Sequence, residues 1–355
     1  MIQQQVALAL RAFTPDSISG LIDCVLHNDS EVVATRAEQI LSDIGDEATT
    51  DIIQSFAPPV PGRTHLLVQV LEHIRNPQAI PPLIAFLENP QLSSQVDQSL
   101  QVAVVHALGQ FPDERVVAPL LEMLESSNPL IYEGAINALS CLEAIALEGL
   151  LAALDEKGYQ KEVENSEGVQ VGAFTSRIER SILGMIHFPG ERLLDVLAYG
   201  SDSQVWHTVN IFLAKGIEGA QVLARNLFHS NIRLQNNVRF ILGEMNGQVV
   251  VPALLEVLNH PEPAWRAVIT TLILKHPREA IPPLVGLLGD DERADSAQVI
   301  LLEFGSIVLS HVVIGLDALN NQAQEHARDI IVTLVQQTPE SVSYTHLTLP
   351  TILRV

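Results

Sequence analysis

The stretch Ala79-Ile80-Pro81-Pro82-Leu83-Ile84-Ala85-Phe86-Leu87 contains the pattern that decides the fold: two apolar residues, a spacer, and two more apolar residues. The pattern recurs in full from Leu120, Leu150, Leu193, Leu254 and Leu284, and in weaker form from Leu21, Ile52, Leu223 and Val312. Of the nine intervals between successive copies, seven lie between 28 and 31 residues. A fixed period of this size is typical of proteins built from stacked structural repeats.

Each repeat is predicted to contain two helices. In the first, the spacing of the apolar residues gives a broad helical stripe rather than the alternation of a strand. Turn residues that can cap the next helix follow, as in Asn28-Asp29-Ser30, Ser127-Asn128-Pro129 and Gly289-Asp290-Asp291. The second helix is again amphipathic and is expected to end near Gly45, Gly109, Gly243, Pro277 or Gly305. The sequence therefore predicts an all-α protein, an α-solenoid of about ten two-helix repeats.

The repeats resemble a known family. Residues 79–87 and 280–288 are similar to the first helix of HEAT repeats, and residues 36–45 are similar to the second helix, which is rich in alanine and leucine and ends in glycine. Because the period is shorter than the ~40–47 residues of HEAT and armadillo units, the chain most resembles the compact bacterial HEAT-like repeats of phycobilin lyase subunits. The resemblance covers about residues 17–339. It implies, as an alternative function, a lyase-like or chaperone-like subunit that acts on a partner protein.

The expected organisation has three parts. Residues 1–16 form an N-terminal capping helix, residues 17–340 form the solenoid, and residues 341–355 form a probable non-native tail. The run from Val342 to Thr351 resembles the in-frame translation of a sequencing adapter. We therefore expect the natural chain to continue past about Glu340, in which case this is a fragment, for example the regulatory part of a larger enzyme or signalling protein.

Two repeats are longer than the others. One is extended by an interhelical loop at residues 91–95, and another by the polar insertion 155–168, which contains five acidic residues and two lysines. Insertions in repeat proteins often project from the binding face. The alternative is a surface loop without a function, since lengthening a loop costs little free energy.

Composition excludes several classes of function. The chain has 355 residues, of which 47% are apolar, and no apolar run approaches the ~18–20 residues of a membrane span. The N-terminus lacks the basic start of a secretory signal, so a cytoplasmic location is expected. Acidic residues outnumber basic ones 42 to 20, for a formal charge of −22. This charge argues against nucleic acid and favours a basic protein or peptide partner.

Catalytic and metal motifs are missing from the sequence. It contains no glycine-rich phosphate loop, no Gly-x-Ser-x-Gly and no His-Glu-x-x-His. It also lacks the repeated His-Glu dipeptides of deoxyhypusine hydroxylase, a di-iron family built from HEAT-like repeats. His27, His229 and His260 are expected to be solvated or to cap turns, and Cys24 and Cys141 to be small core residues. We therefore expect no enzymatic activity, cofactor, metal or small-molecule substrate.

Three large aromatic residues are the candidate partner-binding residues. Tyr132, Trp206 and Trp265 occupy one equivalent position on the second helices. Second helices line the concave surface in this family, and large aromatic side chains are good anchors for a partner. The alternative is that these three side chains belong to the core.

Two pairs of basic residues also lie on second helices. Arg177 with Arg180, and Arg233 with Arg239, are expected to pair with neighbouring acids such as Glu179 and Glu244. The sequence thus predicts a non-enzymatic scaffold or adaptor that presents an extended acidic groove to a protein or peptide.

Overall fold

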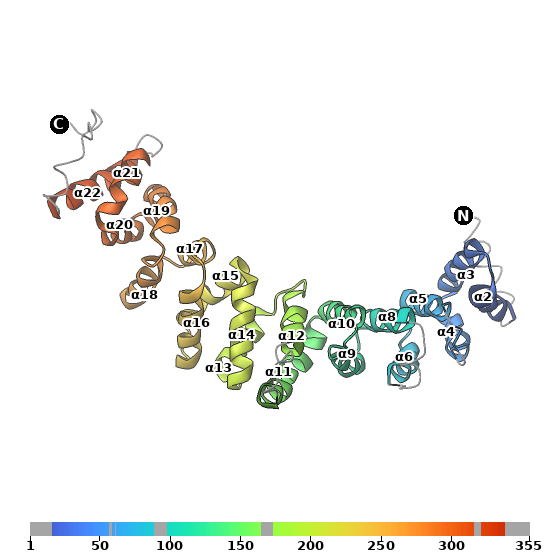
Figure 1. Cartoon of the computed structure of the whole chain (residues 1–355). Coiled ribbons are helices and arrows are strands. Elements are labelled where there is room, and N and C mark those ends of the chain that lie inside the picture. Colours follow the sequence, from blue (N-terminus) through green and yellow to red (C-terminus); the bar gives the residue numbers. More distant parts are fainter. Residues whose placement is uncertain are drawn as a thin grey trace. The chain divides into compact units, whose positions relative to one another are not determined.

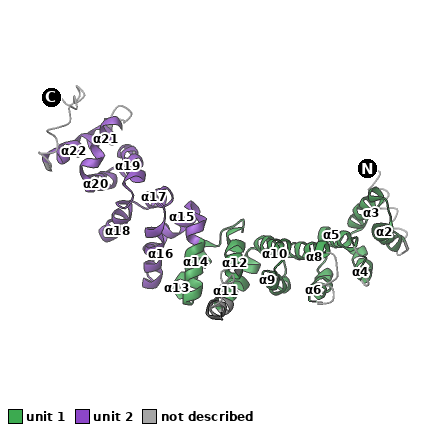
Figure 2. Ribbon diagram, in the orientation of Figure 1, with its two compact units in different colours: residues 1–211 green, residues 212–355 purple. Residues whose placement is uncertain are grey.

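The computed structural model describes residues 16–56, 59–60, 62–88, 98–164, 173–315 and 321–337. These residues form α-helices and short 3-10 helices, and no strand occurs among them (Figure 1). The chain divides into two compact units, residues 1–211 and residues 212–355 (Figure 2). The boundary falls inside helix α14 (Asp202–Lys215). Of the expected capping helix, only Asp16 is described, as the first residue of α2, and the tail 341–355 lies outside the described residues.

Helices follow one another in pairs along the chain. In unit 1 the pairs are α2 (Asp16–His27) with α3 (Glu31–Ile44), α4 (Asp46–Gln54) with α5 (Thr64–Ile74), α6 (Ile80–Leu87) with α8 (Gln98–Leu108), α9 (Val117–Met123) with α10 (Pro129–Leu142), α11 (Ala144–Glu164) with α12 (Ala173–Leu183), and α13 (Gly190–Tyr199) with α14, which begins in this unit. In unit 2 they are α15 (Ile217–Arg225) with α16 (Ile232–Glu244), α17 (Gly247–Glu256) with α18 (Pro263–Ile273), α19 (Pro277–Gly286) with α20 (Ala294–Glu303), and α21 (Leu309–Gly315) with α22 (Asn321–Gln337). Short 3-10 helices at Pro77–Ala79, Glu114–Val116, Leu287–Gly289 and Gly305–Val308 connect some of them.

Each copy of the apolar signature begins in the first helix of one pair. Nine of the ten leading residues, from Ile52 to Val312, are fully buried, and only Leu21 is partly exposed. Burial of one such side chain stabilises the fold by about 1.5–3 kcal/mol. A two-helix unit cannot bury its apolar stripe alone, so the stripes are covered by stacking of neighbouring pairs. The predicted all-α solenoid of two-helix repeats is confirmed.

Second helices pack directly on second helices in unit 1. Helices α3, α5, α8, α10 and α12 contact one another in succession. The approach of α8 to α10 is close: a Cβ atom built on Gly109 would lie 2.5 Å from the Cβ of Ala138. Glycine at position 109 therefore allows two neighbouring repeats to meet backbone to backbone.

The turns have the predicted chemistry. Asn128 Oδ1 accepts a hydrogen bond from the Leu130 backbone N–H at 3.0 Å, and Asp290 Oδ1 accepts one from Glu292 at 3.1 Å. His229 and His260 also accept backbone N–H groups two residues further along the chain, at 3.1 and 3.2 Å. Both histidines therefore act as turn caps, as the sequence indicated.

Two details of the predicted helices were wrong. Helix α11 continues to Glu164, so residues 155–164 of the insertion are helical rather than a loop; residues 165–168 and the expected loop at 91–95 lie outside the described residues. Helix α16 ends at Glu244, one residue after Gly243, as predicted, whereas Pro277 begins α19 instead of ending the preceding helix. Proline suits the first turn of a helix because its missing N–H has no partner there in any case.

The predicted burial of the cysteines was also wrong. Cys141 is exposed, and Cys24 is partly exposed. Cys141 lies four residues after Asn137 and eleven after Leu130, which are also exposed, so it continues the outward ridge of α10.

Candidate partner-binding surface

The three candidate aromatic residues lie on second helices, as expected, but in different surroundings. Tyr132 on α10 and Trp206 on α14 belong to unit 1, whereas Trp265 on α18 belongs to unit 2. Trp206 is 58% exposed, and the other two are partly exposed. None of the three lies in the fully buried core.

Trp206 lies beside a buried histidine that is paired with a glutamate of the preceding repeat. The neighbouring His207 is 2% exposed, and its Nδ1 lies 2.8 Å from Glu179 Oε1 on α12. Asn210 Nδ2 donates a second hydrogen bond to the same oxygen at 3.2 Å. The rings of Trp206 and His207 meet edge to face, with centroids 4.9 Å apart. Because successive residues point about 100° apart around a helix, His207 can face inward and fix α14 to α12 while Trp206 faces solvent.

Tyr132 is covered by an arginine of the next repeat. The Arg177 guanidinium lies 3.6 Å from the centre of the Tyr132 ring, a cation–π contact. Arg177 Nη1 also donates to the backbone carbonyls of Leu124 and Ser126 at the turn before α10. Tyr132 therefore forms part of the junction between two repeats, and its ring is less available to a partner than that of Trp206.

Two of the arginines, Arg180 and Arg239, contact groups other than the predicted acids Glu179 and Glu244. Arg180 donates to both carboxylate oxygens of Glu133 at 2.9 and 2.7 Å, and not to Glu179, which is taken by His207. The Arg180 hydrogen bond lowers the pKa of Glu133 below its ordinary value. Arg239 lies over the ring of Trp265 instead of pairing with Glu244. Glu179 and Glu244 were wrong as predicted partners, because the pairing of side chains depends on how one repeat is displaced from the next.

A hollow of about 500 Å³ lies between α10 and α12. Asn137 and Cys141 line it from α10, and Arg180 and Gly184 line it from α12. Gly184 lies close to α10, since a Cβ there would meet Ser140 Oγ at 2.7 Å. We call the exposed surface of α10, α12 and α14, from Tyr132 across Arg180 to Trp206, the α10–α14 face.

Trp265 belongs to an aromatic cluster in unit 2. Its ring centroid lies 5.0 Å from that of Phe228, and Phe228 in turn lies 4.2 Å from His260. The Arg239 guanidinium on α16 lies 5.5 Å from the Trp265 ring centre. Sequence reasoning identified His260 as a turn residue but did not single out Phe228 or place the two rings beside Trp265, because both residues lie outside the repeating pattern.

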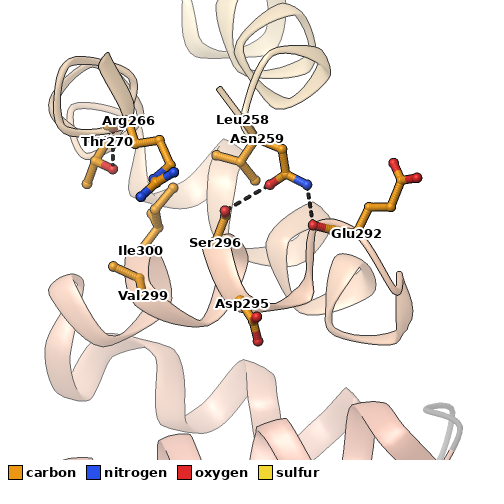
Figure 3. A pocket seen from close by; sticks show the side chains of 9 residues that line it. All are labelled: Leu258, Asn259, Arg266, Thr270, Glu292, Asp295, Ser296, Val299 and Ile300. Atoms are coloured by element: carbon orange, nitrogen blue, oxygen red, sulfur yellow. Dashed lines mark hydrogen bonds between the residues drawn. The ribbon is translucent and has the colours of Figure 1, made fainter. Parts of the chain in front are cut away.

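A second hollow, of about 480 Å³, lies between α18 and α20 in unit 2 (Figure 3). Asn259 contacts Ser296, whose Oγ donates to Asn259 Oδ1 at 2.8 Å, and Asn259 Nδ2 donates to the backbone carbonyl of Glu292. Arg266, on the opposite wall, donates to the backbone carbonyls of His260 and Pro261. These polar groups bind one another and stiffen the walls, and they do not converge on a single point.

The described residues contain no group of three or more His, Cys, Asp or Glu side chains that could hold a metal ion. Within those ranges, every helix is too short or too polar to cross a membrane.

Comparison with known proteins confirms the resemblance stated above. The model of the PBS lyase HEAT-like repeat family matches residues 100–126, which cover most of α8 and all of α9. The bilin biosynthesis protein PecE of Mastigocladus laminosus is 40% identical over 75 residues, which are 21% of this chain and 26% of that protein. PecE of Nostoc sp. (strain PCC 7120 / SAG 25.82 / UTEX 2576) is 43% identical over 70 residues, 20% of this chain and 26% of that protein. The chain thus spans about a quarter of the length of these relatives.

Two solved structures also align over most of the chain. An engineered protein aligns over 93% of this chain and 94% of its own, with a TM-score of 0.32 and 15% identity. Human deoxyhypusine hydroxylase in complex with glycerol aligns over 84% of this chain and 97% of its own, with a TM-score of 0.31 and 19% identity.

Proposed function

We propose that this chain, which carries a repeat of the PBS lyase HEAT-like family, is a lyase-type subunit that holds a partner protein on its second helices during bilin biosynthesis. The similarity to PecE supports the class of reaction. Exposed residues of the α10–α14 face supply the binding surface. The proposal places the chain in the cytoplasm.

Trp206 is the observation that carries the proposal. A tryptophan that is 58% exposed and packs edge to face on the buried His207 ring, which is itself paired with Glu179, loses little side-chain entropy when a partner covers it. Anchors of this kind contribute a large share of the binding free energy of many interfaces, and tryptophan is enriched among them. Arg180 and the hollow beside Cys141 extend the contact area from α14 toward α10.

The charge of the chain supports a basic partner. With a formal charge of −22, the protein attracts basic surfaces at long range and raises the rate of encounter with them. This attraction is screened by salt, so association should slow as the ionic strength rises.

A passive scaffold is the second candidate function. The polar groups around the α18–α20 hollow are satisfied by one another, which suits a rigid platform better than a reacting site. The two functions share the partner-binding surface and differ in one respect: only the lyase-type subunit is expected to interact with a bilin.

The test uses affinity capture of the partner from cell extract, with and without added bilin. Trp206→Ala should reduce recovery of the partner at least tenfold, since a central aromatic anchor contributes about 2 kcal/mol or more. Tyr199→Ala is the matched control, because Tyr199 is a 74% exposed aromatic residue at the end of the first helix α13. Equal recovery with both variants, with unchanged circular dichroism, would contradict the assignment of Trp206.

A further inference from the structure

Unit 2 reverses the charge of the protein locally. Helices α16 and α18 together carry three arginines and one glutamate, and Lys275 lies two residues after the end of α18. The outward ridge of α16 is also apolar: Ile232 is 72% exposed and Phe240 is 58% exposed. In a chain with a formal charge of −22, helices α16 and α18 are therefore locally basic, and α16 also exposes apolar side chains.

Arg239 of α16 has a side-chain N–H group without a hydrogen-bond partner. Its Nε–H is buried and has no hydrogen-bond acceptor. Among the described residues, the one electrostatic contact of its guanidinium is a cation–π contact with Trp265, whose ring centre lies 5.5 Å from the guanidinium carbon. Buried N–H groups are normally satisfied, so an unsatisfied one on a guanidinium indicates the place of an absent acceptor.

Lys275 approaches the same helix one turn further along. A Cβ built on Gly243 would lie 3.0 Å from Lys275 Nζ, so the absence of a side chain at position 243 leaves room for the ammonium over α16. Gly243 follows Arg239 by four residues and therefore lies on the same side of α16. Among the described residues, no carboxylate forms an ion pair with Lys275 or Arg239. Glu244 of α16 is exposed, and the Glu279 carboxylate lies near Gly247, about one turn beyond Gly243.

Aromatic rings form one wall beside these cations. Trp265 packs on Phe228 with ring centroids 5.0 Å apart, and Arg239 lies on the face of Trp265. Arg239 of α16 and Trp265 of α18 meet across the seam between these two helices. The seam between α16 and α18 thus combines flat apolar surface with two unpaired cations.

We infer that this seam is a binding site for an aromatic carboxylate. The carboxylate would accept hydrogen bonds from Arg239, whose planar guanidinium matches the two oxygens of a carboxyl group. The aromatic body would lie against Trp265, and Lys275 would add a second positive charge beside Gly243. This inference does not depend on the proposed partner-binding function, because the seam lies in unit 2 and the α10–α14 face in unit 1.

The chain provides its own reporter for the test. It contains two tryptophans, Trp206 and Trp265, so Trp206→Phe leaves Trp265 as the sole donor for energy transfer. The probe is 1-pyrenebutyrate, and 1-pyrenebutanol is the uncharged comparison with the same ring system. We expect transfer from Trp265 to the acid at concentrations at least tenfold below those needed for the alcohol.

Substitutions in the Trp206→Phe background locate the site. Arg239→Met keeps an apolar stem against Trp265 and should weaken binding of the acid about tenfold, the loss expected for one charge-assisted hydrogen bond. Gly243→Glu should have a similar effect, because it places a carboxylate next to Lys275. Arg278→Met is the matched control: Arg278 is an exposed arginine of the first helix α19 and should leave the affinity unchanged.

Equal affinity for the acid and the alcohol would overturn the inference, and so would an Arg239→Met protein that binds the acid as tightly as its parent. Loss of binding in Arg278→Met to the same extent as in Arg239→Met would also overturn it, because the effect would then come from general charge.

Discussion

The close approach of α8 to α10 makes a quantitative prediction about how the repeats stack. Replacing Gly109 with alanine would put a Cβ 2.5 Å from the Cβ and 2.6 Å from the Cα of Ala138. Favourable carbon–carbon contacts lie at about 3.5–4.0 Å, so the two helices would have to separate by about 1 Å. The obstacle is backbone and Cβ rather than the end of a flexible side chain, so it cannot rotate away.

The expected cost follows from two opposing terms. Forcing an extra carbon into a tightly packed contact costs about 1–3 kcal/mol, and a site blocked by backbone belongs at the upper end. Gly109 follows the last residue of α8 and does not have a positive φ, so alanine there returns about 0.4–1 kcal/mol by reducing the conformational entropy of the unfolded chain. Gly109→Ala should therefore lower the free energy of unfolding by about 1–2 kcal/mol.

Gly20 gives the matched control. It lies inside α2 with no atom within 4 Å of its added Cβ, so Gly20→Ala should raise the free energy of unfolding by about 0.5–1 kcal/mol. Urea unfolding followed by circular dichroism measures both variants, and the midpoints should move in opposite directions. Stabilisation by Gly109→Ala equal to that by Gly20→Ala would refute the close stacking of α8 on α10.

Two further predictions concern polar groups in unit 1. Burial raises the pKa of Glu38, with Arg63 and His73 opposing the shift, so the folded protein binds more protons than the unfolded one just above the ordinary glutamate pKa. Stability should therefore fall as pH rises through that range, and Glu38→Gln should remove this fall and raise the denaturation temperature at neutral pH; an unchanged pH profile would contradict it. His207→Phe should leave the Glu179 carboxylate without its ring partner and lower the free energy of unfolding by about 2 kcal/mol. Because His207 also contacts Trp206, that variant should bind the partner more weakly than the parent protein at a temperature where both are folded.

The sequence predicts the repeats well because their signal is local. The leucine pattern and the capping residues act within about ten residues, and both reappear in the structure, from Ile52 to Val312 and at Asn128 and Asp290. Stacking of helix pairs follows from burial of the apolar stripes, and does not require a specific long-range signal.

The contacts between repeats were not predictable to the same degree. Glu179 pairs with His207, and Arg180 with Glu133, over sequence separations of 28 and 47 residues. Such choices depend on the rotation of one repeat against the next, which a single sequence does not encode locally. Helix α14 shows the consequence, because it buries His207 and Thr208 while Trp206 is 58% exposed. Hydrophobicity alone predicts the opposite, a buried Trp206 with His207 and Thr208 exposed to solvent.

The absorption spectrum of a bilin mixed with the purified chain and its captured partner tests the lyase-type assignment most directly. We predict a shifted and sharpened bilin band when all three components are present, and a weaker change with Trp206→Ala, since that variant no longer holds the partner. Tyr199→Ala should behave as the parent. A bilin spectrum identical to that of free bilin, while the partner is still retained, would contradict the lyase-type assignment and leave a passive scaffold.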